Sequence, residues 1–190
     1  MKKLVVVGVL ALLIGCGREA VFQGKKTSAW IAQLKDKDTA VRQDAIRALG
    51  QMGPAVVPAL VAALNDENSD VRIGAADSLG RLGAEAKSAA PALKWAIKDP
   101  DKEVRRHATF ALGILDPEDL SVIPLMIEAL RDNDLEVRRQ AAVTLGRIGP
   151  PAKAALPALN DVFKNDKQED PRLRMIVHDA ITAISERPFN

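Results

Sequence analysis

A repeated spacing of 33 residues is the sequence feature that most limits what this chain can fold into. Four prolines follow one another at this interval: Pro58, Pro91, Pro124 and Pro157. Val-Arg and Leu-Gly pairs keep the same interval, at 71–72, 104–105 and 137–138 and at 79–80, 112–113 and 145–146. An earlier copy at 41–42 and 49–50 is set back by 30 residues, and a degenerate last copy contains Leu173-Arg174. A fixed interval of this length is typical of a solenoid, in which each unit packs on its neighbours.

Each unit has the pattern of two helices. The first has apolar residues at i, i+3, i+4 and i+7, as in Val57, Leu60, Val61 and Leu64 or in Ile123, Met126, Ile127 and Leu130. The second repeats Val-Arg-x-x-Ala-Ala-x-x-Leu-Gly, as in 137–146, and Gly-Pro at 53–54 and 149–150 ends one helix and begins the next. We therefore predict an all-α, right-handed α-solenoid of about five helix pairs over 27–187. The units are expected at 27–53, 54–83, 84–116, 117–149 and 150–187.

These blocks resemble the HEAT-repeat family, in particular the short HEAT-like repeats of phycobilisome lyases. The resemblance rests on Pro-Ala-Leu at 58–60, 91–93 and 157–159 and on the Val-Arg and Leu-Gly blocks, and it covers 27 to about 187. An acid also stands six residues before each repeated arginine: Asp36/Arg42, Asp66/Arg72, Asp99/Arg105 and Asp132/Arg138. The resemblance implies that these pairs form a structural ladder along the stack. An exposed ion pair contributes only ~0–1 kcal/mol, so exposed rungs would orient turns more than stabilise the fold.

The N-terminus has the pattern of a targeting segment. Lys2 and Lys3 precede an apolar run at 4–14, which is too short to span a membrane and is typical of a signal peptide. Its ending, Leu-Ile-Gly-Cys at 13–16, resembles the bacterial lipobox. The resemblance implies removal of 1–15 and lipidation of Cys16, with 16–26 left as a short polar linker. We expect a lipid-anchored protein on the exported side of the cell envelope, at the outer membrane if there are two membranes.

Composition and motifs argue against several classes of function. The 27 Lys+Arg and 25 Asp+Glu become 25 against 25 once Lys2 and Lys3 are removed, so the mature chain lacks the positive surplus of a nucleic-acid binder. Cys16 is the only cysteine, which excludes a disulfide within the chain. The two histidines, His107 and His178, are far apart, so we expect no metal site, no cofactor and no catalytic group. His178 is expected at the surface or in the end cap.

A candidate partner surface lies on the second helices, which the resemblance implies line the concave face. Phe110 occupies a position where other copies have Arg47 and Asp77. Apolar and arginine residues at neighbouring outward positions complete a pattern typical of interfaces. The candidate partner-binding residues are Ile73, Arg81, Arg106, His107, Phe110, Ile114, Arg139, Gln140, Val143 and Arg147. Alternatively, Phe110 packs between adjacent second helices. Trp95, on the opposite face, is either a scattered surface aromatic or a second contact site.

Together these features predict a non-catalytic, membrane-tethered scaffold that binds an unidentified protein or peptide on its concave face. A chromophore-lyase-like enzyme or assembly factor with the same repeat is the main alternative. A nucleic-acid binder and a purely structural spacer are further alternatives, of which net zero charge and export disfavour the first.

Overall fold

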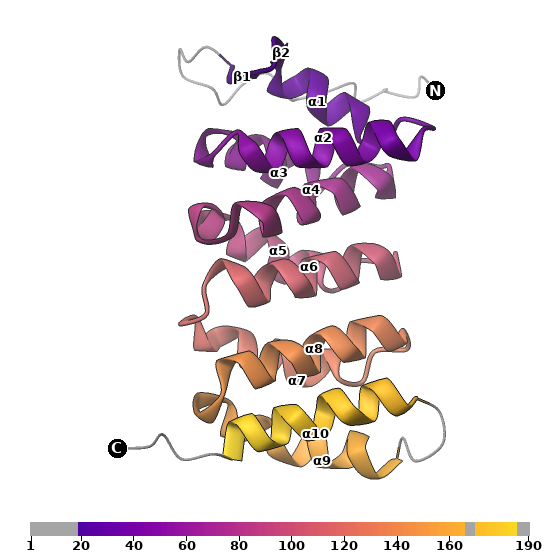
Figure 1. Cartoon of the computed structure of the whole chain (residues 1–190), viewed down its shortest axis with the longest axis vertical. Helices are drawn as coiled ribbons and strands as arrows, with labels where there is room; N and C mark the ends of the chain where they lie inside the picture. Colours follow the sequence, from indigo (N-terminus) through magenta and orange to yellow (C-terminus); the bar gives the residue numbers. More distant parts are fainter. Residues whose placement is uncertain (1–18, 166–169, 186–190) are drawn as a thin grey trace, which may run out of the picture.

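A computed structural model describes residues 19–165 and 170–185, which form a stack of helix pairs (Figure 1). The signal-peptide prediction for 1–15 and the lipid site predicted at Cys16 lie outside the described residues. First helices are α1 (Thr27–Gln33), α3 (Val57–Ala63), α5 (Ala90–Ala96), α7 (Ile123–Ala129) and α9 (Leu156–Asn165). Second helices are α2 (Thr39–Gln51), α4 (Ser69–Leu82), α6 (Lys102–Leu115), α8 (Leu135–Ile148) and α10 (Pro171–Ser185). The predicted all-α solenoid is confirmed.

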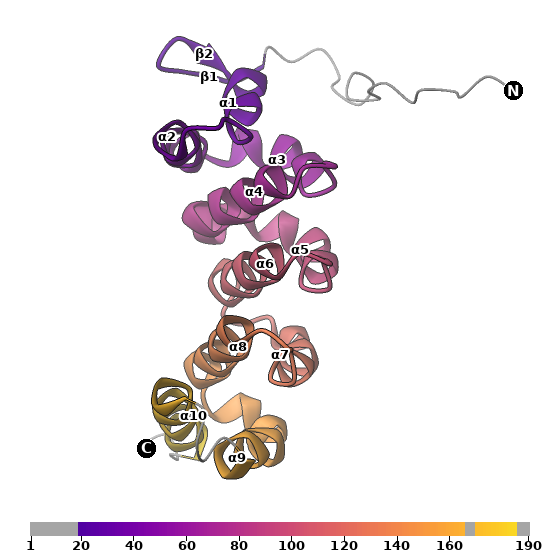
Figure 2. The same ribbon diagram turned by 90° about the vertical axis from the view of Figure 1, so that its right-hand side faces the viewer.

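The two kinds of helix form two rows. Figure 2 shows the second helices in one row and the first helices in the other, with the row of second helices bowed inward at its middle. The outer side of that row is therefore the concave face of the stack. The most extensive contacts between elements join neighbouring second helices, α4 with α6 and α8 with α10.

The apolar stripes of the first helices pack inward as their spacing predicts. Val57, Leu60 and Leu64 are buried in the second unit, whereas Val61 at the edge of the stripe is half-buried. Full burial of such a side chain contributes about 1.5–3 kcal/mol. Because every unit adds its stripe to the next, the core is one continuous layer between the rows.

The repeated prolines begin helices and do not kink them. Each is the second residue of its first helix, where a missing backbone N–H leaves no helical hydrogen bond unmade: Pro58, Pro91, Pro124 and Pro157. A 3₁₀ turn precedes each of these helices: η1 (Pro54–Val56), η2 (Gly83–Ala89), η3 (Leu120–Val122) and η4 (Pro150–Ala155). Gly53 and Gly149, with φ of 72° and 69°, end the preceding second helices in the left-handed region.

The Leu-Gly glycines lie inside the second helices, where they allow close helix packing. A Cβ built on Gly113 would lie 2.6 Å from Oγ1 and 2.9 Å from Cγ2 of Thr144 on the next second helix. A Cβ built on Gly146 would lie 3.1 Å from the backbone Cα of Ala180. At Gly80 the same atom would make only ordinary contacts, with Phe110 and Ala111 at 3.5 Å.

The arginine ladder joins successive units, which corrects the pairing suggested by the sequence. Arg72 donates from Nε and Nη2 to both carboxylate oxygens of Asp99, at 2.8 and 2.9 Å and 27 residues further along the chain. Arg105 binds Asp132 in the same bidentate way, at 2.8 and 2.9 Å. The acid six residues earlier supplies its backbone carbonyl, not its carboxylate, as in the 2.9 Å bond from Arg105 Nη1 to Asp99 O.

Two of the four predicted rungs thus become inter-unit ion pairs among the described residues. Their side chains are only 11–14% exposed, so solvent screens these pairs less than a surface ion pair. The hydrogen bonds to Asp132 raise the pKa of Arg105, and those to Asp99 raise the pKa of Arg72. Arg42 instead donates to the carbonyls of Asp36 and Lys37 and to Thr39 Oγ1, within its own turn. Arg138 donates to the carbonyls of Asp132 and Asn133.

The residues before α1 are a correction to the predicted polar linker. Val21–Phe22 (β1) and Lys25–Lys26 (β2) form an antiparallel hairpin around Gln23 and Gly24, both with positive φ. Phe22 and Ala20 pack against the core. The Trp30 indole N–H donates to Phe22 O at 3.1 Å, and Thr27 N donates to Ala20 O at 3.0 Å. The hairpin therefore covers the N-terminal end of the stack (Figure 1).

We predict that the ladder contact, and not arginine as such, supplies the stability at these turns. Arg105→Ala should lower the free energy of unfolding by about 2–3 kcal/mol. The reason is that the mostly buried carboxylate of Asp132 would be left without its cation. Arg42→Ala, the matched control at the same repeat position, should cost about 1 kcal/mol or less. Urea unfolding followed by circular dichroism measures both. Equal losses would contradict a special role for the inter-unit contact.

We also predict opposite outcomes for alanine at two glycines of the same column. Gly113→Ala should destabilise the fold by about 1–3 kcal/mol, because its Cβ overlaps the buried, β-branched Thr144. Gly80→Ala should be neutral or stabilising by up to ~1 kcal/mol, because the helix propensity of alanine is gained without a clash. Thermal unfolding of the two variants makes the comparison. A loss at Gly80 as large as that at Gly113 would contradict it.

Candidate functional site

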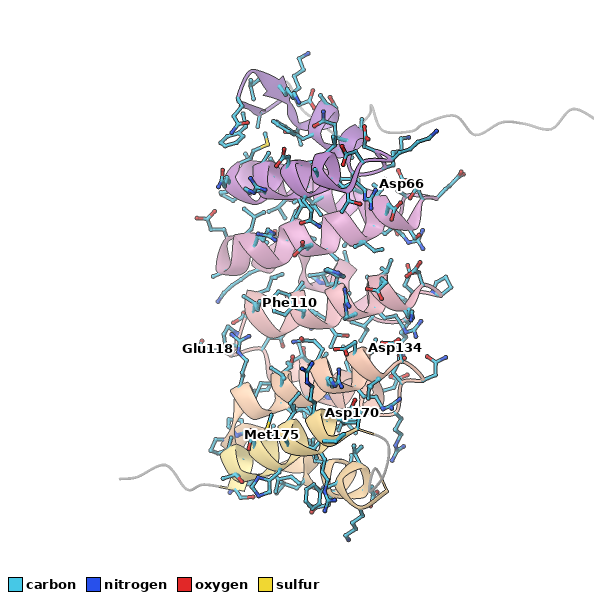
Figure 3. All side chains as sticks on the ribbon, turned by 45° about the vertical axis from the view of Figure 1, so that its right-hand side comes forward. Asp66, Phe110, Glu118, Asp134, Asp170 and Met175 are labelled. Carbon is cyan, nitrogen blue, oxygen red and sulfur yellow. The ribbon has the colours of Figure 1, made fainter. Side chains whose placement is uncertain are left out.

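The predicted partner-binding residues lie on three consecutive second helices. Ile73 and Arg81 are on α4, whereas Arg106, His107, Phe110 and Ile114 are on α6. Arg139, Gln140, Val143 and Arg147 are on α8. Figure 3 shows Phe110 and Met175 on the row of second helices, with Asp66, Asp134 and Asp170 along the opposite edge, at the turns before second helices. We call the outward surface of α4, α6 and α8 around Phe110 the central patch.

Phe110 combines the two roles that the sequence left open. Its ring contacts the Gly80 position on α4, where a built Cβ would lie 3.5 Å from Cδ1. The residue nevertheless remains 37% exposed. One edge of the ring therefore packs against α4 at Gly80, and the rest of the ring faces solvent.

The other apolar residues of the central patch are half-buried. Ile73, Ile114 and Val143 each leave part of their surface accessible. Met175 on α10, in the same repeat column as Ile73, is a further exposed apolar side chain on the second-helix row, at 60%. Sequence analysis did not select Met175, although its column position was the available signal.

The arginines of the central patch differ in their exposure and in whether a carboxylate of the chain pairs with them. Arg81 lies 3.5 Å from Asp77, and Arg106 lies 2.7 Å from Glu103. Both pairs are within one helix, and both arginine side chains are more than a third exposed, at 47% and 38%. Arg147 is exposed, and no carboxylate of residues 19–165 or 170–185 lies within ion-pair distance of it.

Arg139 is a correction to the predicted site. Its side chain is only 15% exposed and forms ion pairs with Glu136 on α8 and with Asp170. Asp170 also accepts hydrogen bonds from the first backbone N–H groups of α10, at Arg172 and Leu173, and the latter bond chiefly holds its pKa below the ordinary value. Arg139 therefore fixes the start of α10 against α8 and is not presented to a partner.

The surroundings of His107 favour its neutral form. Burial lowers the pKa of this imidazole, Asp77 opposes that effect, and Arg106 reinforces it. The Arg106 guanidinium lies 3.1 Å from the His107 ring nitrogen Nε2. An unprotonated Nε2 can accept a hydrogen bond from Arg106, so His107 orients this arginine without adding charge to the patch.

A second concave feature, missed in the sequence, is a cavity of about 400 Å³ at the N-terminal end. The hairpin, α1 and α2 form its walls, and most of its lining is polar: Gln23, Lys25, Gln33, Asp44, Arg47 and Gln51. The Lys25 ammonium lies 4.3 Å from the centre of the Trp30 ring. We call this feature the hairpin pocket. The Gln23-Gly24 turn was the one available signal for it.

The opposite, convex face is mostly polar around one exposed aromatic. Trp95 on α5 is 80% exposed, and a neighbouring lysine, Lys98, pairs with Glu128 on α7 at 3.1 Å.

His178 on α10 lies at the surface beside Asp179, 3.5 Å away. Among the described residues no three His, Cys, Asp or Glu side chains gather in a way that would hold a metal ion.

In the described part of the chain, no single helix is long and apolar enough to cross a membrane. The pair Thr39–Gln51 and Pro54–Ala63 meets the length and hydropathy criteria only together, and it is bent by 113°.

Known structures with a similar fold are repeat solenoids. The complex of CpcE and CpcF of phycocyanin lyase from Nostoc sp. PCC7120 matches with a TM-score of 0.70 and 20% identity, over 81% of this chain and 96% of that one. A designed armadillo repeat protein in complex with the peptide (KR)4 matches with a TM-score of 0.59 and 18% identity, over 83% and 81%. An engineered protein matches at 0.57 and 23% identity, over 83% and 78%. No curated protein has a significantly similar sequence.

The family itself is shown by sequence. The profile of HEAT repeats matches residues 27–94 and 89–178, which is most of the chain. These ranges contain the helix pairs, the Arg72 and Arg105 rungs and the central patch. The chain therefore belongs to the HEAT-repeat family.

Proposed function

We propose that this protein is a membrane-tethered, non-catalytic interaction module that holds a protein or peptide against its concave face. The observation that carries the proposal is Phe110, an aromatic side chain that remains 37% exposed at the middle of the second-helix row. Arg81 and Arg106 lie on the same face with partly exposed guanidinium groups. An aromatic centre bordered by arginine is the composition that interfaces favour.

Two of the similar structures support the kind of partner, because they are complexes. One contains a designed repeat protein with the peptide (KR)4, and the other contains CpcE together with CpcF. Partners held in these ways are polypeptides, and a polypeptide is what we propose for the central patch.

A chromophore-lyase-like enzyme or assembly factor is the second candidate. The likeness to the CpcE and CpcF complex, with a TM-score of 0.70, favours it. Binding of a tetrapyrrole, seen as a change in its absorbance on addition of the purified protein, would support this second candidate.

The central patch can be tested by site-specific photocrosslinking in the cells that make the protein. A photoreactive phenylalanine analogue in place of Phe110 should give a discrete protein adduct. The same analogue in place of Trp95, the matched exposed aromatic on the convex face, should not. Phe110→Ala should weaken binding of the captured partner about thirtyfold or more, since hot-spot truncations cost about 2 kcal/mol or more. Equal adducts at both positions, or no effect of Phe110→Ala with circular dichroism unchanged, would overturn the proposal.

The tether can be tested separately. We propose that Cys16 carries the lipid, because the Leu-Ile-Gly-Cys ending at 13–16 matches the lipobox pattern. Cys16→Ser should move the protein from the membrane fraction to the soluble fraction, because serine lacks the thiol that carries the acyl anchor. Mass spectrometry of the wild-type N-terminus should find the acyl groups on Cys16. Unchanged membrane association of an unacylated Cys16→Ser protein would contradict the tether.

A further inference from the structure

The hairpin pocket lies in line with the central patch, on the same concave face. Asp44, Arg47 and Gln51 of α2 occupy the repeat positions that His107, Phe110 and Ile114 occupy on α6. The pocket is thus the N-terminal end of the surface that the proposed function uses. Its second wall is formed by α1 and the hairpin. Among the described units only the first has such a hairpin.

The walls of the pocket are fixed by backbone contacts. Trp30, 4% exposed, donates its indole N–H to Phe22 O at 3.1 Å, and Thr27 donates to Ala20 O through both its N–H and its hydroxyl. Gln23 and Gly24 turn the chain with φ of 50° and 74°, which returns Lys25 over the Trp30 ring. Strained backbone of this kind, in a non-glycine residue such as Gln23, is concentrated at functional sites.

Lys25 and Arg47 in the pocket lining have more N–H donors than the neighbouring acceptors of the lining occupy. Lys25 donates to Gln33 Oε1 at 3.4 Å, and one Arg47 nitrogen, Nη2, lies 3.1 Å from Asp44. An ammonium has three N–H donors and a guanidinium has five. Two cations against one carboxylate leave a net positive pocket with spare donors, among them a planar guanidinium that matches a carboxylate in geometry.

We propose that the hairpin pocket binds the C-terminal carboxylate of an extended polypeptide whose preceding residues run along the concave face. This inference rests on the proposed function, because the central patch then holds another part of the same polypeptide. A volume of about 400 Å³ lies within the range of small-ligand sites and suits a chain end better than a folded surface.

The spacing of the helices sets the length of the bound segment. Two steps of about 8–10 Å separate α2 from α6, which gives roughly 16–20 Å between the positions of Arg47 and Phe110. An extended chain covers about 3.3–3.6 Å per residue, so the residue about five positions before the carboxyl end reaches Phe110. We therefore expect an apolar side chain at that position of the partner.

The two tryptophans of the chain provide a direct test, because Trp30 lines the pocket and Trp95 lies on the convex face. The full chain in detergent, with ¹⁵N-labelled tryptophan, is titrated with N-acetyl-Ala-Ala as the free acid and as the C-terminal amide, and with acetate. The free acid should shift the Trp30 indole signal saturably and leave Trp95 unmoved. The amide and acetate should each bind about tenfold more weakly or not at all, since neither offers both a carboxylate and a peptide backbone.

Variants separate the pocket from the central patch. Arg47→Gln, at an exposed position, should abolish the dipeptide response, and Phe110→Ala should leave it unchanged because two residues cannot reach α6. A longer probe, N-acetyl-Leu-(Ala)5 as the free acid, should bind more tightly than the dipeptide in the wild type but not in Phe110→Ala.

Equal binding of free acid and amide, equal binding of acetate, or a response that survives Arg47→Gln would overturn the pocket assignment. A specific dipeptide response without any gain from the longer probe would keep the pocket and count against the central patch, and hence against the proposed function.

Discussion

The stack depends on one repeated contact, in which the guanidinium of an arginine binds groups of two successive turns. Arg105 bonds to the carbonyls of its own turn and, bidentately, to Asp132 of the next. Each such side chain therefore fixes the shape of one turn and the distance to the following unit. Because the pair is mostly removed from solvent, loss of either partner leaves an uncompensated charge, and the ladder defines register as much as it adds stability.

The fold was predictable from the sequence because it is periodic, and the ladder partner was not. Buried stripes such as Val57, Leu60 and Leu64 follow from helical spacing alone. The same sequence offers Arg72 two acids, Asp66 six residues before it and Asp99 further along. Only the packing of one complete helix pair on the next brings the second of these to 2.8 Å. The nearer acid is occupied instead with its own turn, where Asp66 accepts from Asn68 N.

The candidate site was predictable only where it follows the repeat columns. Phe110 and Arg81 lie on the concave face because their repeat positions place them there. Arg139 also has an outward repeat position, but its side chain is only 15% exposed and pairs with Asp170. Asp170, just before α10, pairs with Arg139 on α8, and a column count carries no information about that contact. The hairpin was not predicted from the sequence, for a different reason. Its main stabilising bonds end on backbone atoms, at Phe22 O and Ala20 O, so no side-chain pattern in the sequence records them.

Both features that suggest binding are departures from the repeat, and the same physical constraint explains them. A position that contacts the next unit in every copy must keep its residue type, so the buried columns and the ladder have little freedom to specify a partner. Phe110 is available because only one edge of its ring packs against α4 at Gly80, and the side chain stays 37% exposed. Lys25 and Arg47 are available because a hairpin, and not another helix pair, packs on α1 in the described residues and leaves a polar cavity beside α2. The end of the stack and the middle of its concave row are therefore where this chain can differ from other solenoids without a cost to its stacking.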